Sequence, residues 1–204
     1  MKVVFDFEAV ITHRYSGFYT FGTNLLREIG KLEKSPKLLL LCSRRNSKKA
    51  VEIKEDIIPH ADVKALSFKQ RHLETFYNFF SVPDLKTLVG HFDVYNSFHH
   101  FMPPAKKKPR VLTVHDLRRY ALPDLYPNSK LNRFETAVHR ADHFIAVSQA
   151  TKNDLCSYFK INDSAVTVIP LAVNLNAHNE QSREDDLSLK QSLIFNNGGD
   201  YLPY

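Results

Sequence analysis

The sequence predicts an α/β protein built on a doubly wound, mostly parallel sheet of about seven strands. Two observations lead to this prediction. Short, continuously apolar runs such as 37–42 and 111–114 recur along the chain, which is typical of strands covered on both faces of a parallel sheet. Segments with apolar residues at helical spacing lie between these runs, so strands and helices alternate. A chain of 204 residues that is 43% hydrophobic is long and apolar enough for one large domain of this kind.

The amino-terminal part is expected to form a strand, a loop and a helix. Residues 2–7 are apolar and aromatic and indicate the first strand, and 8–15 are expected to be a loop. Ser16 is a good helix cap, and apolar residues at helical spacing predict a helix from there to about residue 33. Two interpretations are open: an ordinary capped helix, or one whose amino end also receives an anion.

The segment 71–80 is amphipathic and aromatic. As a helix it could pack on the core, lie on a membrane, or shape an acceptor groove. The other expected elements are strand 37–42, a solvated basic loop at 43–49, helix 50–58, strand 63–66, helix 83–90, strand 92–96, strand 111–114, helix 128–140, strand 142–147, a helix capped by Ser148, and strand 165–169.

The composition changes at the carboxyl-terminal end of the chain. Residues 174–186 are polar and charged and indicate a linker, and 187–195 could form one short helix. The expected division is therefore 1–173 for the sheet domain and 174–204 for a linker or tail.

The net charge and the cysteine content indicate which kinds of binding partner and which cellular compartment to expect. The net charge of +6 and pI near 9.2 suit anionic partners such as phosphorylated sugars or acidic lipids, whereas no nucleic acid is expected because the basic loops lack interleaved aromatic residues. Cys42 and Cys156 are expected to be buried free thiols. Without a bilayer-spanning run or a signal-peptide pattern, a cytoplasmic protein is expected, with peripheral contact at the inner face of the membrane left open.

His115 and Asp116 directly follow the apolar run 111–114. If that run is a strand, both residues stand at its carboxyl end, where open α/β sheets bind ligands. An imidazole beside a carboxylate suits a polar substrate. The alternative is that His115 bonds a loop and Asp116 caps the next helix. Neither a Gly-x-Gly-x-x-Gly motif nor a P-loop is present, which argues against the usual dinucleotide and nucleotide triphosphate sites.

Six segments occur together in an order that is familiar from one family. They are Gly17 with its aromatic helix, DVYNSFHHFMPP at 93–104, VLTVHDL at 111–117, RADHFIAVS at 140–148, ATKNDL at 150–155 and VIPLAV at 168–173. In this order they resemble the amino-terminal half of a GT-B glycosyltransferase of the family-4 retaining type.

The resemblance implies two Rossmann-like domains that face each other across a cleft. The amino-terminal domain would bind the acceptor, a sugar or lipid-linked glycan, and the other would bind a nucleoside-diphosphate sugar, without a cofactor or catalytic metal. The family's acidic donor-binding signature is not found in the sequence, so the chain alone is expected to be inactive, as a truncated or split enzyme. The alternative is a non-catalytic glycan- or glycolipid-binding module that kept the fold.

The resemblance also assigns roles to residues. His115 matches the family's central histidine near the transferred sugar, and Asp116 would orient its loop or contact the acceptor. Gly17 matches a close-approach glycine. The other residues implied in substrate binding are Phe18, Tyr19, His99, His100, Ser148 and Thr151. For the last two, at a strand-to-helix turn, a helix cap is the alternative.

Two departures from the family pattern stand out. Tyr19 and Thr20 occupy positions where relatives often have glycine and arginine, so space is lost and a phosphate contact is absent.

Histidines at 99, 100, 139 and 143 could suggest zinc, but they are not grouped as structural zinc requires, and no metal is expected.

Overall fold

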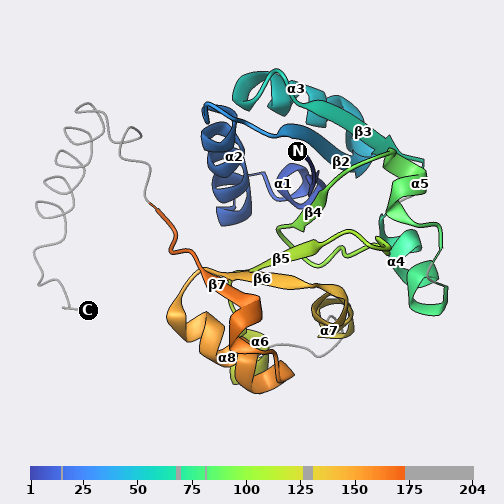
Figure 1. Ribbon diagram of the computed structural model, residues 1–204. Coiled ribbons are helices and arrows are strands. Elements are labelled where there is room, and N and C mark those ends of the chain that lie inside the picture. Colours follow the sequence, from blue (N-terminus) through green and yellow to red (C-terminus); the bar gives the residue numbers. More distant parts are fainter. Residues whose placement is uncertain (15, 68–69, 81, 126–130, 173–204) are drawn as a thin grey trace, which may run out of the picture. The chain divides into compact units, whose positions relative to one another are not determined.

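The computed structural model describes residues 1–14, 16–67, 70–80, 82–125 and 131–172, and residues 1–171 form one compact unit (Figure 1). Its centre is a single sheet in which all seven strands are parallel, in the order β3-β2-β1-β4-β5-β6-β7. The predicted fold class is therefore confirmed. The strands are β1 Lys2–Asp6, β2 Lys37–Ser43, β3 Asp62–Leu66, β4 Val94–Ser97, β5 Arg110–Val114, β6 His143–Ala146 and β7 Val166–Val168.

The strand order reverses direction at β1. The chain first builds outward from β1 to β3, then returns to the other side of β1 with β4 and continues to β7. Phe5 therefore has Leu40 of β2 on one side and Asn96 of β4 on the other. The crevice beyond the carboxyl ends of β1 and β4 is the point at which such sheets bind ligands.

Helices connect the strands and cover the sheet. They are α1 Glu8–Thr12, α2 Gly17–Gly30, α3 Ser47–Ile57, α4 Gln70–Phe79, α5 Leu85–Val89, α6 Arg118–Ala121, α7 Leu131–Arg140 and α8 Gln149–Phe159, with short 3-10 turns at Arg44–Asn46, Pro123–Leu125 and Asp163–Ala165. Two expectations were wrong. The segment 8–15, expected to be a loop, contains α1, and the basic stretch 43–49 comprises the last residue of β2, a 3-10 turn and the first residues of α3. The linker and helix expected within 174–204 lie outside the described residues.

Tertiary contacts explain why α1 forms. Its middle residues Ala9, Val10 and Ile11 are buried, and the Glu8 carboxylate accepts hydrogen bonds from the Ser43 backbone and hydroxyl, 2.7 and 2.8 Å away. The Asn46 side-chain amide donates a further bond of 2.8 Å to the same carboxylate. These partners lie more than thirty residues away along the chain, so the local sequence does not reveal them.

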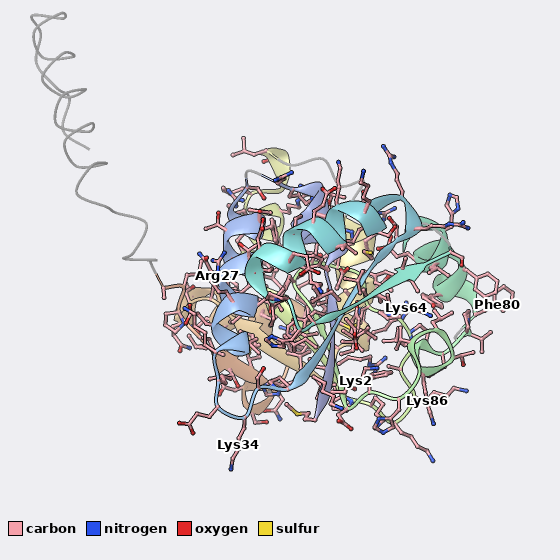
Figure 2. All side chains as sticks on the ribbon, turned by 90° about the horizontal axis from the view of Figure 1, so that it is seen from above. Lys2, Arg27, Lys34, Lys64, Phe80 and Lys86 are labelled. Atoms are coloured by element: carbon pink, nitrogen blue, oxygen red, sulfur yellow. The ribbon has the colours of Figure 1, made fainter. Side chains whose placement is uncertain are left out.

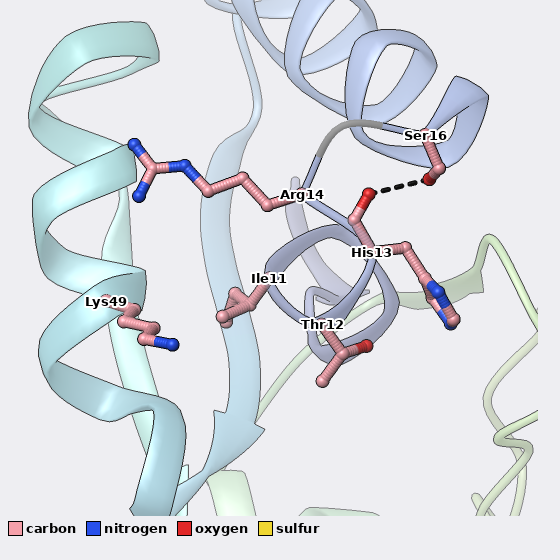
Figure 3. Close-up of a pocket in the computed structure, with 6 residues that line it drawn as sticks. All are labelled: Ile11, Thr12, His13, Arg14, Ser16 and Lys49. Atoms are coloured by element: carbon pink, nitrogen blue, oxygen red, sulfur yellow. Dashed lines mark hydrogen bonds between the residues drawn. The ribbon is translucent and has the colours of Figure 1, made fainter.

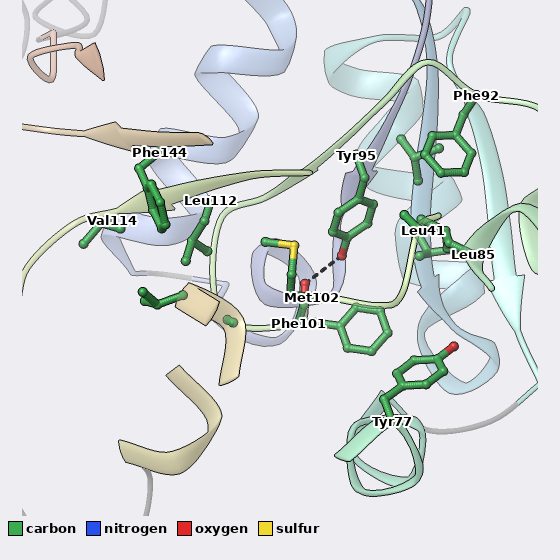
Figure 4. Close-up of a cluster of buried hydrophobic side chains, with 14 of the residues drawn as sticks. Leu41, Tyr77, Leu85, Phe92, Tyr95, Phe101, Met102, Leu112, Val114 and Phe144 are labelled. Carbon is green, nitrogen blue, oxygen red and sulfur yellow. Dashed lines mark hydrogen bonds between the residues drawn. The ribbon is translucent and has the colours of Figure 1, made fainter. Parts of the chain in front are cut away.

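Side chains alternate across the strands and fill one core on each face of the sheet. Val3, Phe5 and Leu40 face one core, which α1, α2 and α3 cover, and Val4 and Leu41 face the other, which α4, α5, α7 and α8 cover. Figure 4 shows the second core, in which the buried Tyr95 hydroxyl donates a 2.8 Å hydrogen bond to the Phe101 carbonyl. This bond satisfies the only polar atom of a fully buried side chain and ties β4 to the loop that follows it.

Both cysteines are free, as expected. Cys42 is fully buried in β2, whereas Cys156 is only partly buried on α8. Burial, with the carboxylates of Glu8 and Asp6, raises the pKa of Cys42 to about 12. Among the described residues, none of the helices has the length and apolar character needed to cross a membrane.

Candidate functional site

Three segments meet at the carboxyl edge of the sheet, and each follows a different strand. The α1–α2 turn and the start of α2 follow β1, the segment beginning at Phe98 follows β4, and His115 follows β5. They contribute a set of stacked rings that we call the histidine–aromatic cluster. Its members are His13, Phe18, Phe21, His99 and His115. The cluster lies at the switch point that the strand order defines.

His115 stands between two phenylalanines of α2. Its ring centroid is 4.8 Å from that of Phe18 and 4.9 Å from that of Phe21, and both contacts are edge-to-face. Burial lowers the pKa of His115, and the nearby Asp116 carboxylate opposes this shift. Its Nε2 atom is buried and has no hydrogen-bond partner among the described residues. A neutral imidazole with an unused nitrogen at a ligand-binding edge is suited to bond a hydroxyl group.

The Asp116 carboxylate contacts Arg118, at the start of α6. Its Oδ1 accepts a hydrogen bond from the Arg118 backbone N–H at 3.2 Å, and its Oδ2 lies 3.0 Å from the guanidinium. The side chain is 44% exposed. Asp116 thus holds the first turn of α6, as the alternative interpretation expected, although the N-cap position itself is Leu117.

His99 and His100 contact each other and then different neighbours. Burial, and after it the charges of His100, His13 and His115, lower the pKa of His99 to about 2. The His100 Nε2 lies 3.8 Å from a Glu74 carboxylate oxygen of α4. Burial raises the pKa of Glu74, whose other oxygen is 3.3 Å from the Arg133 guanidinium. His99 therefore belongs to the cluster, whereas His100 links it to α4.

The start of α2 leaves space at Gly17. Apart from the adjoining residues and the backbone of its own helix, a Cβ atom at this exposed position would meet no atom of the described residues within 4 Å. Ser16 occupies the N-cap position, but the expected capping bond is absent, because its hydroxyl donates to the His13 carbonyl at 2.6 Å. Tyr19 is partly buried and packs against the core beneath α2. The region open to a ligand therefore lies over Gly17. The Tyr19 side chain packs on the core and does not occupy that region.

Ser148 and Thr151 form the predicted helix cap. The Ser148 hydroxyl accepts a 3.0 Å bond from the Thr151 backbone N–H and lies 3.0 Å from the Thr151 hydroxyl. The Thr151 hydroxyl also donates a long bond of 3.5 Å to the His115 carbonyl. The cap is therefore confirmed, and it also supports the backbone that carries His115.

Sequence reasoning missed His13 and Phe21 as members of the cluster. Phe21 was expected only on the buried face of the helix, and His13 was assigned to a loop. His13 directly follows α1 and lies three and four residues after Val10 and Ala9, and this helical spacing is the local signal that was available.

Of the histidines considered for zinc, His99 and His100 contact each other, whereas His139 and His143 have other neighbours. His139 is exposed near the end of α7, and the His143 Nε2 is 2.9 Å from the Thr167 hydroxyl. Within the part of the chain that the structure describes, no three His, Cys, Asp or Glu side chains are grouped so that they could hold a metal ion.

A parallel sheet with its strand order reversing at β1, and with polar and aromatic side chains gathered at that crevice, defines a Rossmann-like α/β protein of the ligand-binding class. The family model for Glycosyltransferase Family 4 matches residues 10–177. The chain therefore belongs to glycosyltransferase family 4, and the resemblance in the sequence is confirmed. A search of curated proteins found no match.

Solved structures show the same fold at low identity. A UDP-GlcNAc 2-epimerase from Neisseria meningitidis bound to UDP-GlcNAc is 16% identical, with a TM-score of 0.51 over 82% of this chain and 46% of its own. UGT89C1 from Arabidopsis thaliana, complexed with UDP, is 11% identical, with a TM-score of 0.50 over 92% of this chain and 54% of its own. The chain thus spans about half the length of the structures that it matches.

Proposed function

We propose that this chain is the acceptor-binding half of a retaining glycosyltransferase that uses a nucleoside-diphosphate sugar, and that it is inactive until a donor-binding half completes the cleft. The observation that carries the proposal is the buried Nε2 of His115, which has no partner among the described residues at the switch point. Membership of glycosyltransferase family 4 and the half-length matches to solved structures support it.

In this proposal His115 bonds a hydroxyl of the transferred sugar or the acceptor. Its neutral ring can either donate or accept at Nε2, depending on the tautomer. Phe18 and Phe21 hold the ring and exclude water from two sides. Asp116, through Arg118, and the Ser148–Thr151 cap position the loop that carries His115. His99 contributes an uncharged surface beside Phe18, and His100 supports it from the side of α4.

The reaction would break the bond between the anomeric carbon and the diphosphate and form one from that carbon to an acceptor oxygen. The acceptor hydroxyl gives its proton to the diphosphate oxygen that departs, and the nucleoside diphosphate leaves with the electron pair of the broken bond. No cofactor takes part in this proposal. Cationic groups and helix amino ends would stabilise the leaving diphosphate. UDP-sugars are the first donors to test, because the two solved structures with the same fold hold UDP or a UDP-sugar.

The test compares the chain alone with the chain joined to a donor-binding half. The chain alone is expected to transfer no sugar, and the joined enzyme is expected to transfer it. His115→Ala should then lower kcat/KM by about 100-fold, which corresponds to about 2.7 kcal/mol of transition-state stabilisation. His139→Ala is the matched control, since that histidine is exposed on α7. Normal turnover with His115→Ala would contradict the assignment of the site.

The non-catalytic alternative has a different outcome. If the joined protein binds glycans but transfers nothing with any nucleotide sugar, a binding module that kept the fold is the better description. Titration with donor and acceptor separately distinguishes the two.

We also propose peripheral contact with the inner face of the cytoplasmic membrane through the end of α4. Leu73 and Tyr77 of α4 are buried, but Phe76 and Phe80 are 44% and 56% exposed, with ring centroids 5.0 Å apart. Phe80 projects outward at the edge of the molecule (Figure 2). The expected result is sedimentation with anionic vesicles that Phe76→Ser/Phe80→Ser abolishes. Equal sedimentation of the variant would count against membrane contact.

A further inference from the structure

A hollow opens beside α1, between α1 and α3. Its volume is about 570 Å³, and it is lined by Ile11, Thr12, His13, Arg14, Ser16 and Lys49. Figure 3 shows the Arg14 side chain reaching across toward α3 and the Lys49 side chain of α3 directed back toward Ile11. We call this hollow the basic pocket. Its size is that of a small-molecule site.

The basic pocket carries uncompensated positive charge. Arg14 and Lys49 are both exposed, and neither forms an ion pair or hydrogen bond with any other described residue. None of the described lining residues is acidic. Glu8, at the start of α1, is already bonded to Ser43 and Asn46. The two cations are therefore free to bind an anion.

The remaining polar groups of the basic pocket are already donating to the backbone. The Thr12 hydroxyl donates to the Glu8 carbonyl at 2.8 Å, and the Ser16 hydroxyl donates to the His13 carbonyl. The cationic side chains must therefore provide the attraction for an anion. An arginine and a lysine that line one pocket suit a phosphate, which arginine can contact with two parallel bonds and lysine as a point charge.

One turn of the chain separates the basic pocket from the histidine–aromatic cluster. His13 belongs to this turn, and its ring points away from Arg14 and Lys49 (Figure 3). On that far side its centroid lies 5.9 Å from Phe18 and 6.0 Å from His99. A single molecule can therefore place a charged group in the basic pocket and reach the cluster with another part.

We infer that the basic pocket binds the phosphate or diphosphate group of the acceptor, with Arg14 and Lys49 as its ligands. This inference rests on the proposed function and adds the class of acceptor: a phosphorylated one. The phosphate could belong to a water-soluble sugar phosphate or to a lipid-linked sugar diphosphate. The sequence pattern treated 43–49 as a solvated loop, so this use of Lys49 emerges only from the packing of α3 against α1.

The direct test is titration of the chain with inorganic pyrophosphate, followed by amide NMR. Shifts are expected at residues 11–14 and 49, and Arg14→Gln/Lys49→Gln should weaken binding by at least about 10-fold, since two charge-assisted contacts are lost. Lys34→Gln/Lys37→Gln is the matched control, because it removes the same charge from exposed positions at and before the amino end of β2. Absence of binding, or equal loss in both double variants, would overturn the inference.

A second measurement separates this inference from the proposed function. In the joined enzyme, Arg14→Gln/Lys49→Gln should raise KM about 10-fold for a phosphorylated acceptor and leave KM for its dephosphorylated analogue unchanged. A soluble sugar phosphate and a lipid-linked sugar diphosphate in vesicles, assayed in parallel, identify the source of the phosphate. If KM rises equally for the phosphorylated acceptor and its dephosphorylated analogue, the basic pocket does not bind the acceptor phosphate, and the proposed transferase function is unaffected. Pyrophosphate binding at the pocket without any transfer would refute the transferase alone.

Discussion

The ring of Phe18 lies edge-on against the imidazole of His115, with centroids 4.8 Å apart and planes at 69°. Phe18 belongs to the first turn of α2, after β1, and His115 follows β5. The contact therefore joins segments that leave the sheet on either side of β4. It also sets the environment of the imidazole, because a ring edge in this position keeps water away from it.

Phe18→Ala should raise the pKa of His115 toward the ordinary value of histidine. Burial is the main cause of its lowered pKa, and removal of the ring admits water. An NMR titration of the histidine side chains measures this directly. Phe76→Ala, an exposed phenylalanine on α4, is the control and should leave the His115 titration unchanged. An unaltered titration in Phe18→Ala would show that this ring does not shield the imidazole.

Ser148→Ala should lower the free energy of unfolding by about 1 kcal/mol, because the first turn of α8 loses the side chain that accepts from the Thr151 N–H. Urea denaturation measures the change. Ser157→Ala, at an exposed position within α8, should have little effect. Equal stability of Ser148→Ala and wild type would mean that water replaces the cap without cost.

Glu8→Ala should destabilise the chain by about 2–3 kcal/mol, since it leaves the Ser43 backbone, the Ser43 hydroxyl and the Asn46 amide without their shared acceptor. The loss should be accompanied by faster amide exchange in α1. Glu33→Ala serves as the control, because Glu33 is exposed just beyond α2. A loss of stability without faster exchange in α1 would mean that Glu8 does not hold this helix in place.

Stability should fall as the pH is lowered through the ordinary range of histidine. Burial and the facing groups His100, His13, His115 and Arg119 lower the pKa of His99 to about 2 in the folded chain, whereas in the unfolded chain it titrates near 6.5. Below about pH 6.5 His99 is protonated in the unfolded state but stays neutral in the folded state. The contribution of neutral His99 to the free energy of unfolding is therefore fully present above about pH 6.5 and is lost below it, at up to about 1.4 kcal/mol per pH unit.

Urea unfolding at about pH 7.5 and about pH 5.5 checks this dependence. His99→Phe keeps an aromatic ring and should reduce the difference between the two conditions. His91→Phe, at an exposed position, should preserve it. A pH dependence that is the same in wild type and His99→Phe would show that His99 does not cause it.

Several parts of the fold follow from local pattern. Continuously apolar runs predicted the strands, because helices cover both faces of a parallel sheet and side chains on either face are therefore apolar. Ser148 predicted the start of α8, because a helix cap depends only on a side chain and a backbone N–H three residues apart. His115 directly follows such a run, and this position alone predicted that it lies at the carboxyl edge of the sheet.

Other features depend on contacts between distant residues. α1 forms because Glu8 reaches Ser43 and Asn46, and Asp116 turns to Arg118 although it neighbours His115. The sequence alone determined the sheet, the family and the histidine at its edge, because periodicity and short motifs are properties of neighbouring residues. Only the tertiary structure decided which rings surround His115 and that Arg14 and Lys49 line one pocket, because those neighbours come from different strand-to-helix connections and are brought together only when the sheet assembles.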